Sequence, residues 1–286
     1  MTPKTIITAA LTGVLTTRKQ SPAIPYTPEE IAEEAYRSVE AGASIVHIHA
    51  RQDDGRPAYD IETYGRIYEE VRKRCPDVII NFSTGAMGID RETRIHHIRA
   101  LKPDMAALNM GSMNYAIYSR KAKTFYHDHT FANPFRDIRF YLEVMNEAGT
   151  RPEMECFDTG HIRNAEPLMD LGVLKSPYQF SLIMGVLGGI PASTKNLVHQ
   201  VDQLPRGSHW QVIGVGRHQW PLVAAAVSIG GNVRVGLEDN LYLPDGERAR
   251  SNGELVANAA ALVRLAGGKV ATQAEARQIL GLAKRG

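Results

Sequence analysis

Two histidines separated by one residue carry the most specific chemistry in this sequence. His47 and His49 belong to Ser44–His49, a short, apolar, β-branched run that is typical of a buried strand. Residues two apart on a strand point the same way, so both imidazoles leave one face about 6.6 Å apart at the backbone. Two converging neutral imidazoles form half of a divalent metal site, and nitrogen ligands suit zinc. The alternative is a pair of core histidines hydrogen-bonded to neighbours.

A catalytic zinc needs a third protein ligand, and Glu238 is the best candidate. In the run Arg234–Glu238 the odd-numbered positions are apolar, so Arg234, Gly236 and Glu238 are expected to share the inward face of a strand. The alternative role for the two charged residues is a structural ion pair. Asp239 comes next in the chain. Arg234 is expected to hold the pKa of Asp239 low, which makes this carboxylate a candidate general base.

The other histidines fit a metal site less well. His127 and His129 repeat the spacing, but they lie in residues 111–133, a polar and aromatic stretch without a strand pattern. We predict a loop there that folds over the site. His161, just after a predicted strand, is a weaker alternative ligand. Surface or capping positions are expected for His96, His97, His199 and His209.

Three further segments offer substrate contacts. Ser83, Thr84 and Gly85 provide hydroxyls and close backbone approach, which suits a substrate carboxylate, and Asn109 ends the next predicted strand. Gly188 and Gly189 permit close approach of a ligand. A simple turn is the alternative for either glycine-containing segment.

The segment that contains Gly214, Gly216 and Arg217 is a weak phosphate-binding motif. It follows the seventh predicted strand, where barrels tend to bind phosphate through backbone N–H groups. Arg217 is suited to hold a phosphate or carboxylate through two parallel hydrogen bonds. A tight turn with a solvated arginine is the alternative.

Eight strand-like runs alternate with helical ones, and no linker interrupts them. This is the count for a (β/α)₈ barrel in which residues 1–286 form a single domain, and barrel chemistry sits at the C-terminal ends of the strands. A doubly wound open sheet is the rival fold. The predicted strands are Thr5–Leu11, Ser44–His49, Val78–Phe82, Met105–Met110, Glu153–Phe157, Gln179–Met184, Gln211–Val215 and Val233–Glu238.

Helix starts are visible between these strands. Thr27 to Glu30 forms a capping box with proline at the first helical position, and Thr272 to Glu275 caps the last helix. Asn133 and Pro134 open a helix that ends near Gly149. Segments 161–171 and 194–203 fit the remaining gaps less clearly.

The bulk composition narrows the class of protein. A net charge of +2, from 33 basic and 31 acidic residues, argues against a nucleic-acid partner. The two cysteines, Cys75 and Cys156, have neither metal-type nor disulfide-type spacing, so we expect a cytoplasmic protein. No apolar run is long enough to span a membrane.

Taken together, these motifs resemble the β-keto acid cleavage enzymes, the family of 3-keto-5-aminohexanoate cleavage enzyme. The resemblance covers nearly the whole chain. The matching blocks are Thr8–Gly13, Val46–Arg51, Asp53–Pro57, Ser83–Gly85, Leu108–Gly111, Gly214–Arg217 and Arg234–Asn240.

The resemblance implies a zinc-dependent barrel that forms homo-oligomers, often tetramers. Such enzymes convert a β-keto acid and acetyl-CoA into acetoacetate and a new acyl-CoA. It also implies roles for particular residues. His47, His49 and Glu238 look like the zinc ligands, Asp239 looks like the base, and Arg234 looks like its electrostatic partner. Ser83 looks like a contact for the substrate carboxylate.

Two departures from the family pattern concern the substrate. Leu15 stands where the amino-keto acid enzyme carries a glutamate for the substrate ammonium, and Ala107 stands where it carries a threonine. Without that carboxylate a cationic substrate lacks its partner, so we expect a neutral, fairly apolar β-keto acid near Leu15. Glu155 matches another family carboxylate and leaves some room for a polar substrate.

Three rival functions remain at this level. A metal-dependent amidohydrolase also pairs His-x-His with a late aspartate, but Phe157–Asp158 and Met184–Gly185 occupy the places of its further histidines. A zinc-dependent retro-aldolase that does not use CoA is the second. A non-catalytic binding protein with a structural metal is the third.

Overall fold

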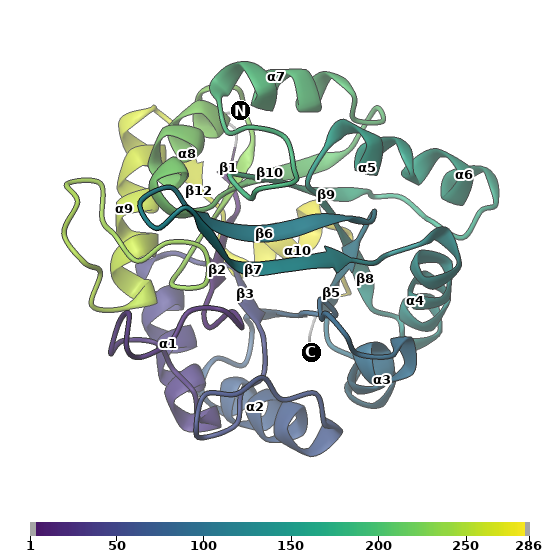
Figure 1. The fold of residues 1–286 in the computed structure, drawn as a ribbon, viewed down its shortest axis with the longest axis horizontal. Coiled ribbons are helices and arrows are strands. Elements are labelled where there is room, and N and C mark those ends of the chain that lie inside the picture. The colour runs from purple at the N-terminus through teal and green to yellow at the C-terminus, as the bar shows by residue number, and fades with distance from the viewer. Residues whose placement is uncertain (1–3, 284–286) are drawn as a thin grey trace.

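The computed structural model describes residues 4–283, in which eight parallel strands close into a barrel (Figure 1). The order of the strands around the barrel follows the chain, and β11 pairs with β2 to complete the ring. The predicted (β/α)₈ fold is therefore confirmed. The barrel strands are β2 (Ile7–Ala10), β3 (Ile45–Ile48), β4 (Ile79–Phe82), β5 (Met105–Asn109), β8 (Arg151–Cys156), β9 (Gln179–Met184), β10 (His209–Gly214) and β11 (Asn232–Val235).

Helices surround the barrel and bury their apolar faces against the strands (Figure 1). The two predicted capping boxes are confirmed, and Gly149 ends α4 in the left-handed conformation that glycine favours. Segment 161–171 contains two short helices instead of one. The helices are α1 (Pro28–Ala41), α2 (Ile61–Arg74), α3 (Arg91–Leu101), α4 (Phe135–Ala148), α5 (Thr159–Arg163), α6 (Ala165–Asp170), α7 (Thr194–Asp202), α8 (Gln219–Ser228), α9 (Asn252–Leu265) and α10 (Gln273–Ile279), with a 3₁₀ turn, η1, at Gly216–His218.

The two ends of the barrel are closed differently. At the N-terminal end of the strands, α10 contributes Ala276 to an apolar cluster with Ile45 and Ile79. The short strands β1 (Lys4–Thr5) and β12 (Lys269–Val270) pair beside it. At the C-terminal end a two-stranded hairpin crosses the mouth (Figure 1). Packing thus seals one end and leaves the other available for a ligand.

The hairpin corrects the expectation of a loop between residues 111 and 133. β6 (Met113–Ser119) pairs antiparallel with β7 (Thr124–Phe131), and the register shifts between Ile117 and Tyr118. Its side chains do not alternate cleanly between apolar and polar, because both faces of this exposed ribbon carry mixed residues. This absence of a period-two pattern explains why the sequence did not predict strands here.

The last barrel strand is shorter than expected, and this changes how the site is built. β11 ends at Val235, whereas the sequence predicted a strand to Glu238. Gly236 has φ of 150°, and a Cβ there would lie 2.1 Å from the Ala10 carbonyl oxygen. Only glycine fits this close approach of two backbones. Glu238 and Asp239 therefore lie in a turn beyond the strand.

The barrel interior contains a polar layer that the sequence did not predict. Glu153 is buried, and it accepts hydrogen bonds from Asn81, Ser181 and Gln211. Thr8 donates in turn to Gln211 across 2.8 Å. The signal was present in the alternation of Glu153 and Glu155 along β8, which directs both carboxylates inward. No helix within residues 4–283 is long and apolar enough to cross a membrane.

Candidate active site

Three predicted metal ligands converge at the C-terminal end of the barrel. One ligand atom from each of His47, His49 and Glu238 lies within 4.8 Å of the others. Glu238 Oε1 is 3.7 Å from His47 Nε2 and 3.6 Å from His49 Nε2. The two imidazole rings stand edge to face with their centroids 5.3 Å apart. The strand spacing therefore delivers both rings to one carboxylate, as the sequence predicted.

The donor atoms of this cluster fit a divalent metal ion. His47 is almost fully buried, and neither of its ring nitrogens makes a hydrogen bond within the described residues, although Asn81 lies beside it on β4. Glu238 Oε2 is also buried and has no hydrogen-bond partner among residues 4–283. Burial lowers the pKa of His47 well below its usual value, which keeps the ring neutral. Unpartnered buried polar atoms are costly, and a cation between them would satisfy them.

Arg234 organises the carboxylates around this cluster. Its guanidinium donates to both oxygens of Asp239, over 2.9 and 3.0 Å, and to Glu238 Oε1 over 2.5 Å. A third carboxylate, Glu155, lies 3.3 Å away and accepts from Nη1. All four side chains are largely buried. The ion pair proposed as the alternative role of Glu238 is thus present within the same group that converges on the histidines.

The environment separates the pKa values of the three carboxyl groups. Burial raises the pKa of Asp239 to about 6, although Arg234 lowers it. Arg234 lowers this pKa as expected, but burial outweighs it, and the group is still mostly ionised above pH 7. Burial raises the pKa of Glu155 to about 8. Burial also raises the pKa of Glu238, but Arg234 and the histidines outweigh it and hold that pKa well below its usual range.

The turn after β11 places two neighbouring carboxylates on one guanidinium. Consecutive residues of a strand point to opposite faces, so a strand to Glu238 would have turned Asp239 away from Arg234. Instead the N–H of Asp239 bonds to the Gly236 carbonyl at 3.0 Å and closes a tight turn. Gly13 packs against this turn, since a Cβ there would lie 2.7 Å from Glu238 Cγ.

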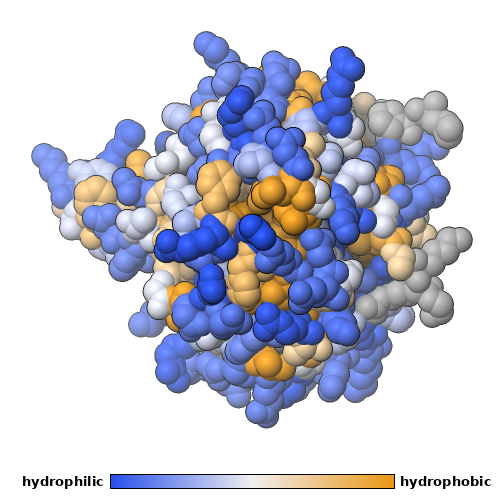
Figure 2. Space-filling model, turned by 90° about the vertical axis from the view of Figure 1, so that its right-hand side faces the viewer, coloured by the Kyte–Doolittle hydropathy of each residue, from blue (hydrophilic) through white to orange (hydrophobic). Residues whose placement is uncertain are grey.

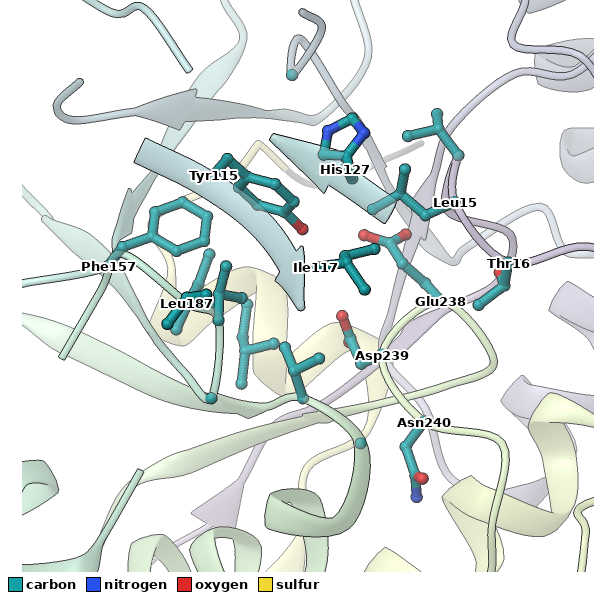
Figure 3. Close-up of a pocket in the computed structure, with 18 of the residues that line it drawn as sticks. Leu15, Thr16, Tyr115, Ile117, His127, Phe157, Leu187, Glu238, Asp239 and Asn240 are labelled. Atoms are coloured by element: carbon teal, nitrogen blue, oxygen red, sulfur yellow. The ribbon is translucent and has the colours of Figure 1, made fainter. Parts of the chain in front are cut away.

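A cavity of about 1830 Å³ opens above the cluster (Figure 3). Of the expected substrate contacts, five line it: Leu15, Ser83, Gly85, Asn109 and Glu155. Asn109 has a buried Nδ2 with no partner within residues 4–283, so one donor there is free for a ligand.

Two expected substrate contacts lie outside the cavity wall. Thr84 is buried, and its hydroxyl donates to the Ala107 carbonyl over 2.6 Å. Ala107 is fully buried in β5, at the level of Glu153. Both residues therefore support the strands below the cavity, and the expected direct contact with substrate is wrong for both.

Two backbone N–H groups in the segment after β10 are already hydrogen-bonded to other parts of the chain. The Val215 N–H donates to the Met184 carbonyl and the Gly216 N–H donates to the Asp239 carbonyl. Gly214 does not line the cavity, because the backbone at Gln219 fills the space beside it. These two N–H groups cannot bind phosphate as expected. Gly216 and the Arg217 side chain do line the cavity.

The structure places the other candidate histidines apart from the cluster. His127 and His129 line the cavity from β7, so the predicted cover over the site is present although it is a hairpin. His161 packs over Gly111, and its Nδ1 accepts from the Phe157 N–H.

One of the expected surface histidines is in the interior. His97 is buried and stacks on Tyr64 with ring centroids 3.9 Å apart, and its Nε2 lies 3.1 Å from the Ser83 carbonyl oxygen. The expected surface position is therefore wrong. The sequence signal for this burial was weak: Ile95 and Ile98 lie near His97 at a spacing that suits one helix face.

Sequence reasoning missed the apolar side of the cavity. Ile183 and Ile213, from β9 and β10, pack with Phe157 and with Met113 and Phe131 of the hairpin. Tyr115 of β6 leans on this cluster, and its hydroxyl points into the cavity (Figure 3).

A buried arginine that the sequence did not single out for a role holds the loop after β2. Arg51 donates to the carbonyl oxygens of Gly13, Thr16 and Gly55 over 2.6 to 2.9 Å. It also packs over the Tyr26 ring, 5.1 Å from its centroid. Arg51 thereby holds in place the loop that carries Leu15 beside the cluster.

Residues 4–282 match the model of the beta-keto acid cleavage enzyme family. The chain belongs to this family. The (β/α)₈ barrel agrees with that membership. The chain is accordingly an enzyme, which removes the non-catalytic binding protein from the alternatives.

Relatives in the family match over nearly their full length. The chain is 42% identical to 3-keto-5-aminohexanoate cleavage enzyme of Fusobacterium nucleatum subsp. nucleatum, over 99% of this chain and all of the relative. It is 36% identical to 3,5-dioxohexanoate:acetyl-CoA acetone transferase of Paraburkholderia graminis, over 98% of this chain and 96% of the relative. A solved apo structure of ObcA superposes with a TM-score of 0.79 at 25% identity, covering 92% of this chain and 66% of ObcA.

Proposed function

We propose that this family member is a zinc-dependent enzyme that converts a β-keto acid and acetyl-CoA into acetoacetate and a new acyl-CoA. The observation that carries the proposal is the convergence of His47, His49 and Glu238 beside the Arg234-bound Asp239. His49, Glu238 and Asp239 line one cavity, with His47 buried beside it, in a chain of the family that cleaves β-keto acids. The name of the Paraburkholderia relative, 3,5-dioxohexanoate:acetyl-CoA acetone transferase, supports acetyl-CoA as the co-substrate.

We assign the zinc to His47, His49 and Glu238, whose two nitrogens and one carboxylate are a common donor set for catalytic zinc. The bound ion would act as a Lewis acid that polarises the keto group of the substrate. Ser83 and Gly85 lie on the cavity wall, where a hydroxyl and an open backbone suit the substrate carboxylate. The free Nδ2 group of Asn109 is positioned to donate a hydrogen bond to the same molecule.

Asp239 is the proposed base for the first step. It removes a proton from C2 of the β-keto acid, and the resulting carbon nucleophile attacks the thioester carbonyl of acetyl-CoA. A C–C bond forms, the C–S bond breaks, and CoA leaves as a thiolate. Arg234 stays bound to both oxygens of Asp239 and holds this carboxylate in one orientation.

In the remaining steps the CoA thiolate forms the new thioester, and the proton is returned to the product. The CoA thiolate adds to the original keto carbon, and the C2–C3 bond then breaks in a reverse Claisen cleavage. The products are the new acyl-CoA and the carbanion of acetoacetate, which takes its proton back from Asp239. The apolar cluster that includes Phe157, Ile183 and Ile213 keeps water from the thioester.

We further propose that the acid carries a neutral and fairly apolar side chain. Leu15 is 40% exposed at the cavity wall, and Ile117 of the hairpin faces the same space (Figure 3). Besides Glu238 and Asp239, the described part of the cavity wall carries one carboxylate, Glu155, which already accepts a hydrogen bond from Arg234. The cavity therefore lacks a free anion beside Leu15 for a cationic substrate. Gly216 and Arg217 are the proposed contacts for CoA, with Arg217 pairing a phosphate.

A homo-oligomer, with a tetramer favoured, completes the proposal. Figure 2 shows the side of the molecule that carries α4 and α6, where apolar side chains gather among hydrophilic ones. Phe135 at the start of α4 is 50% exposed and Leu171 after α6 is 61% exposed, and we propose that this side contacts a second copy of the chain. We also propose a cytoplasmic enzyme, because Cys75 and Cys156 are both free thiols.

A panel assay tests the function directly. Zinc-loaded enzyme is given assorted β-keto acids, each with and without acetyl-CoA, and acetoacetate is measured. We expect acetoacetate only when both substrates are present. Turnover that does not depend on acetyl-CoA would instead favour the retro-aldolase or the amidohydrolase. Turnover of 3-keto-5-aminohexanoate as efficient as that of 3-oxohexanoate would contradict an apolar substrate.

A further inference from the structure

Tyr115 brings a hydroxyl to the cavity from an element that has no role in the proposed chemistry. The proposed metal ligands and base lie on or just after β3 and β11 of the barrel, whereas Tyr115 belongs to β6, in the hairpin that follows β5. Figure 3 shows its hydroxyl directed into the cavity toward the carboxylates of Glu238 and Asp239. A donor from the hairpin can thus reach a substrate that lies on the metal cluster.

Three aromatic rings hold the Tyr115 ring in place. The ring centroids of His127, Phe131 and Phe157 lie 5.9, 6.1 and 6.3 Å from that of Tyr115, each nearly perpendicular to it. Edge-to-face contacts of this kind are favourable and fix the direction of the ring. The hydroxyl is therefore presented by a packed ring and does not depend on a mobile side chain.

The backbone that carries Tyr115 is also anchored to the barrel. Ala116 forms a β-bridge with Leu187 in the loop after β9. Gly188 lies against the same strand so closely that a Cβ would fall 1.8 Å from the Asn114 carbonyl oxygen. The close approach that the sequence allowed for a ligand at Gly188 is thus used to dock the hairpin. This contact sets the height of Tyr115 above the cluster.

Arg234, the arginine beside the carboxylates, is already engaged. Arg234 directs its Nε and both Nη atoms to Asp239, Glu238 and Glu155. Burial, together with the nearby Glu238 and Asp239 charges, raises the pKa of Tyr115 to about 12. The phenol therefore keeps its proton at neutral pH and remains a hydrogen-bond donor.

We propose that the Tyr115 hydroxyl donates a hydrogen bond to the thioester carbonyl oxygen of acetyl-CoA. This inference rests on the proposed function. When C2 of the β-keto acid attacks the thioester carbon, the π electron pair of the C=O bond moves to oxygen, and Tyr115 stabilises that negative charge without giving up its proton. As the C–S bond breaks, that electron pair re-forms the C=O bond and the negative charge leaves on the sulfur of the CoA thiolate. The hairpin thereby contributes an oxyanion contact opposite the polar groups of the barrel.

Tyr115→Phe tests the inference, because it removes the hydroxyl and keeps the packed ring. Loss of one oxyanion donor lowers kcat about 100-fold. We expect that loss, with an unchanged KM for the β-keto acid, unchanged zinc content and unchanged thermal stability. Tyr126→Phe is the matched control, because Tyr126 lies on the same hairpin, is 71% exposed and does not line the cavity. It is expected to retain wild-type kcat.

Exchange of the C2 proton with deuterated water, measured by NMR without acetyl-CoA, separates a failure of the Tyr115 role from a failure of the proposed function. The wild type and Tyr115→Phe are expected to exchange at equal rates, because the hydroxyl acts after proton removal. Tyr115→Phe with normal kcat, or with exchange and turnover reduced together, overturns the role of Tyr115. A change confined to the KM of the β-keto acid overturns it too. A wild type that neither exchanges nor forms acetoacetate overturns the proposed function itself.

Discussion

The two sides of the cavity differ in how their residues are held. On the polar side, His47, His49 and Glu238 converge, and Arg234 binds three carboxylates. On the other side, Phe157 and Ile183 pack with the hairpin through apolar contacts. A buried charged network is intolerant of change, because removing one member leaves the others unpaired. A change in apolar packing is expected to cost less than the loss of one member of this charged network. We therefore expect changes on the polar side to have larger effects on turnover than changes on the apolar side.

Removal of a metal ligand should have the largest effect. His49→Ala is expected to abolish zinc binding and to lower kcat about 4000-fold, because Lewis-acid stabilisation is worth roughly 5 kcal/mol and each 1.4 kcal/mol is a factor of ten. Elemental analysis and a turnover assay check both effects. His129→Ala is the control, since His129 lies outside the cluster. Zinc retained by His49→Ala would contradict the assignment.

Asp239→Asn should lower kcat roughly 1000-fold while zinc is retained, because the amide cannot accept the C2 proton. Arg234 would still contact one oxygen of the side chain, so the fold is expected to persist. Steady-state kinetics and zinc content are the measurements. Normal turnover, or loss of zinc together with loss of stability, would instead assign Asp239 a structural role.

Gly188→Ala disturbs the apolar side alone. A Cβ would collide with Asn114, so the hairpin must shift, and we expect kcat/KM to fall roughly 10- to 100-fold with zinc retained. Gly230→Ala is the control for backbone strain. Gly230 also has positive φ, 83° against 102° for Gly188, but a Cβ there meets nothing within 4 Å. Equal effects of the two variants would show that docking of the hairpin is irrelevant.

Leu15→Glu should give the smallest effect. A partly exposed carboxylate beside a substrate ammonium is worth about 1 kcal/mol, or about a fivefold change in affinity. We expect KM to fall by that factor for 3-keto-5-aminohexanoate and to rise for 3-oxohexanoate. Leu15→Gln, which is uncharged and of similar size, separates charge from shape. An unchanged preference in Leu15→Glu would place the substrate side chain elsewhere in the cavity.

The sequence by itself determined the barrel and the centre of the site. Strand periodicity placed His47 and His49 on one face, and caps such as Thr27 and Thr272 set helix starts. These signals are local, because period-two alternation and capping depend only on residues a few positions apart. Glu238 was grouped with the histidines because the alternation after Arg234 predicted that it faces inward, although β11 ends at Val235.

Only the tertiary structure decided how the groups meet. Gly236 ends β11 because the Ala10 carbonyl lies too close for a side chain, and this turn brings both Glu238 and Asp239 to Arg234. The pKa of Asp239 rises because burial outweighs one arginine, a balance that no sequence motif states. Tyr115 reaches the cavity because the hairpin docks on Gly188, more than 70 positions away in the chain. Such long-range contacts leave no periodic trace in the sequence, so only the folded chain reveals them.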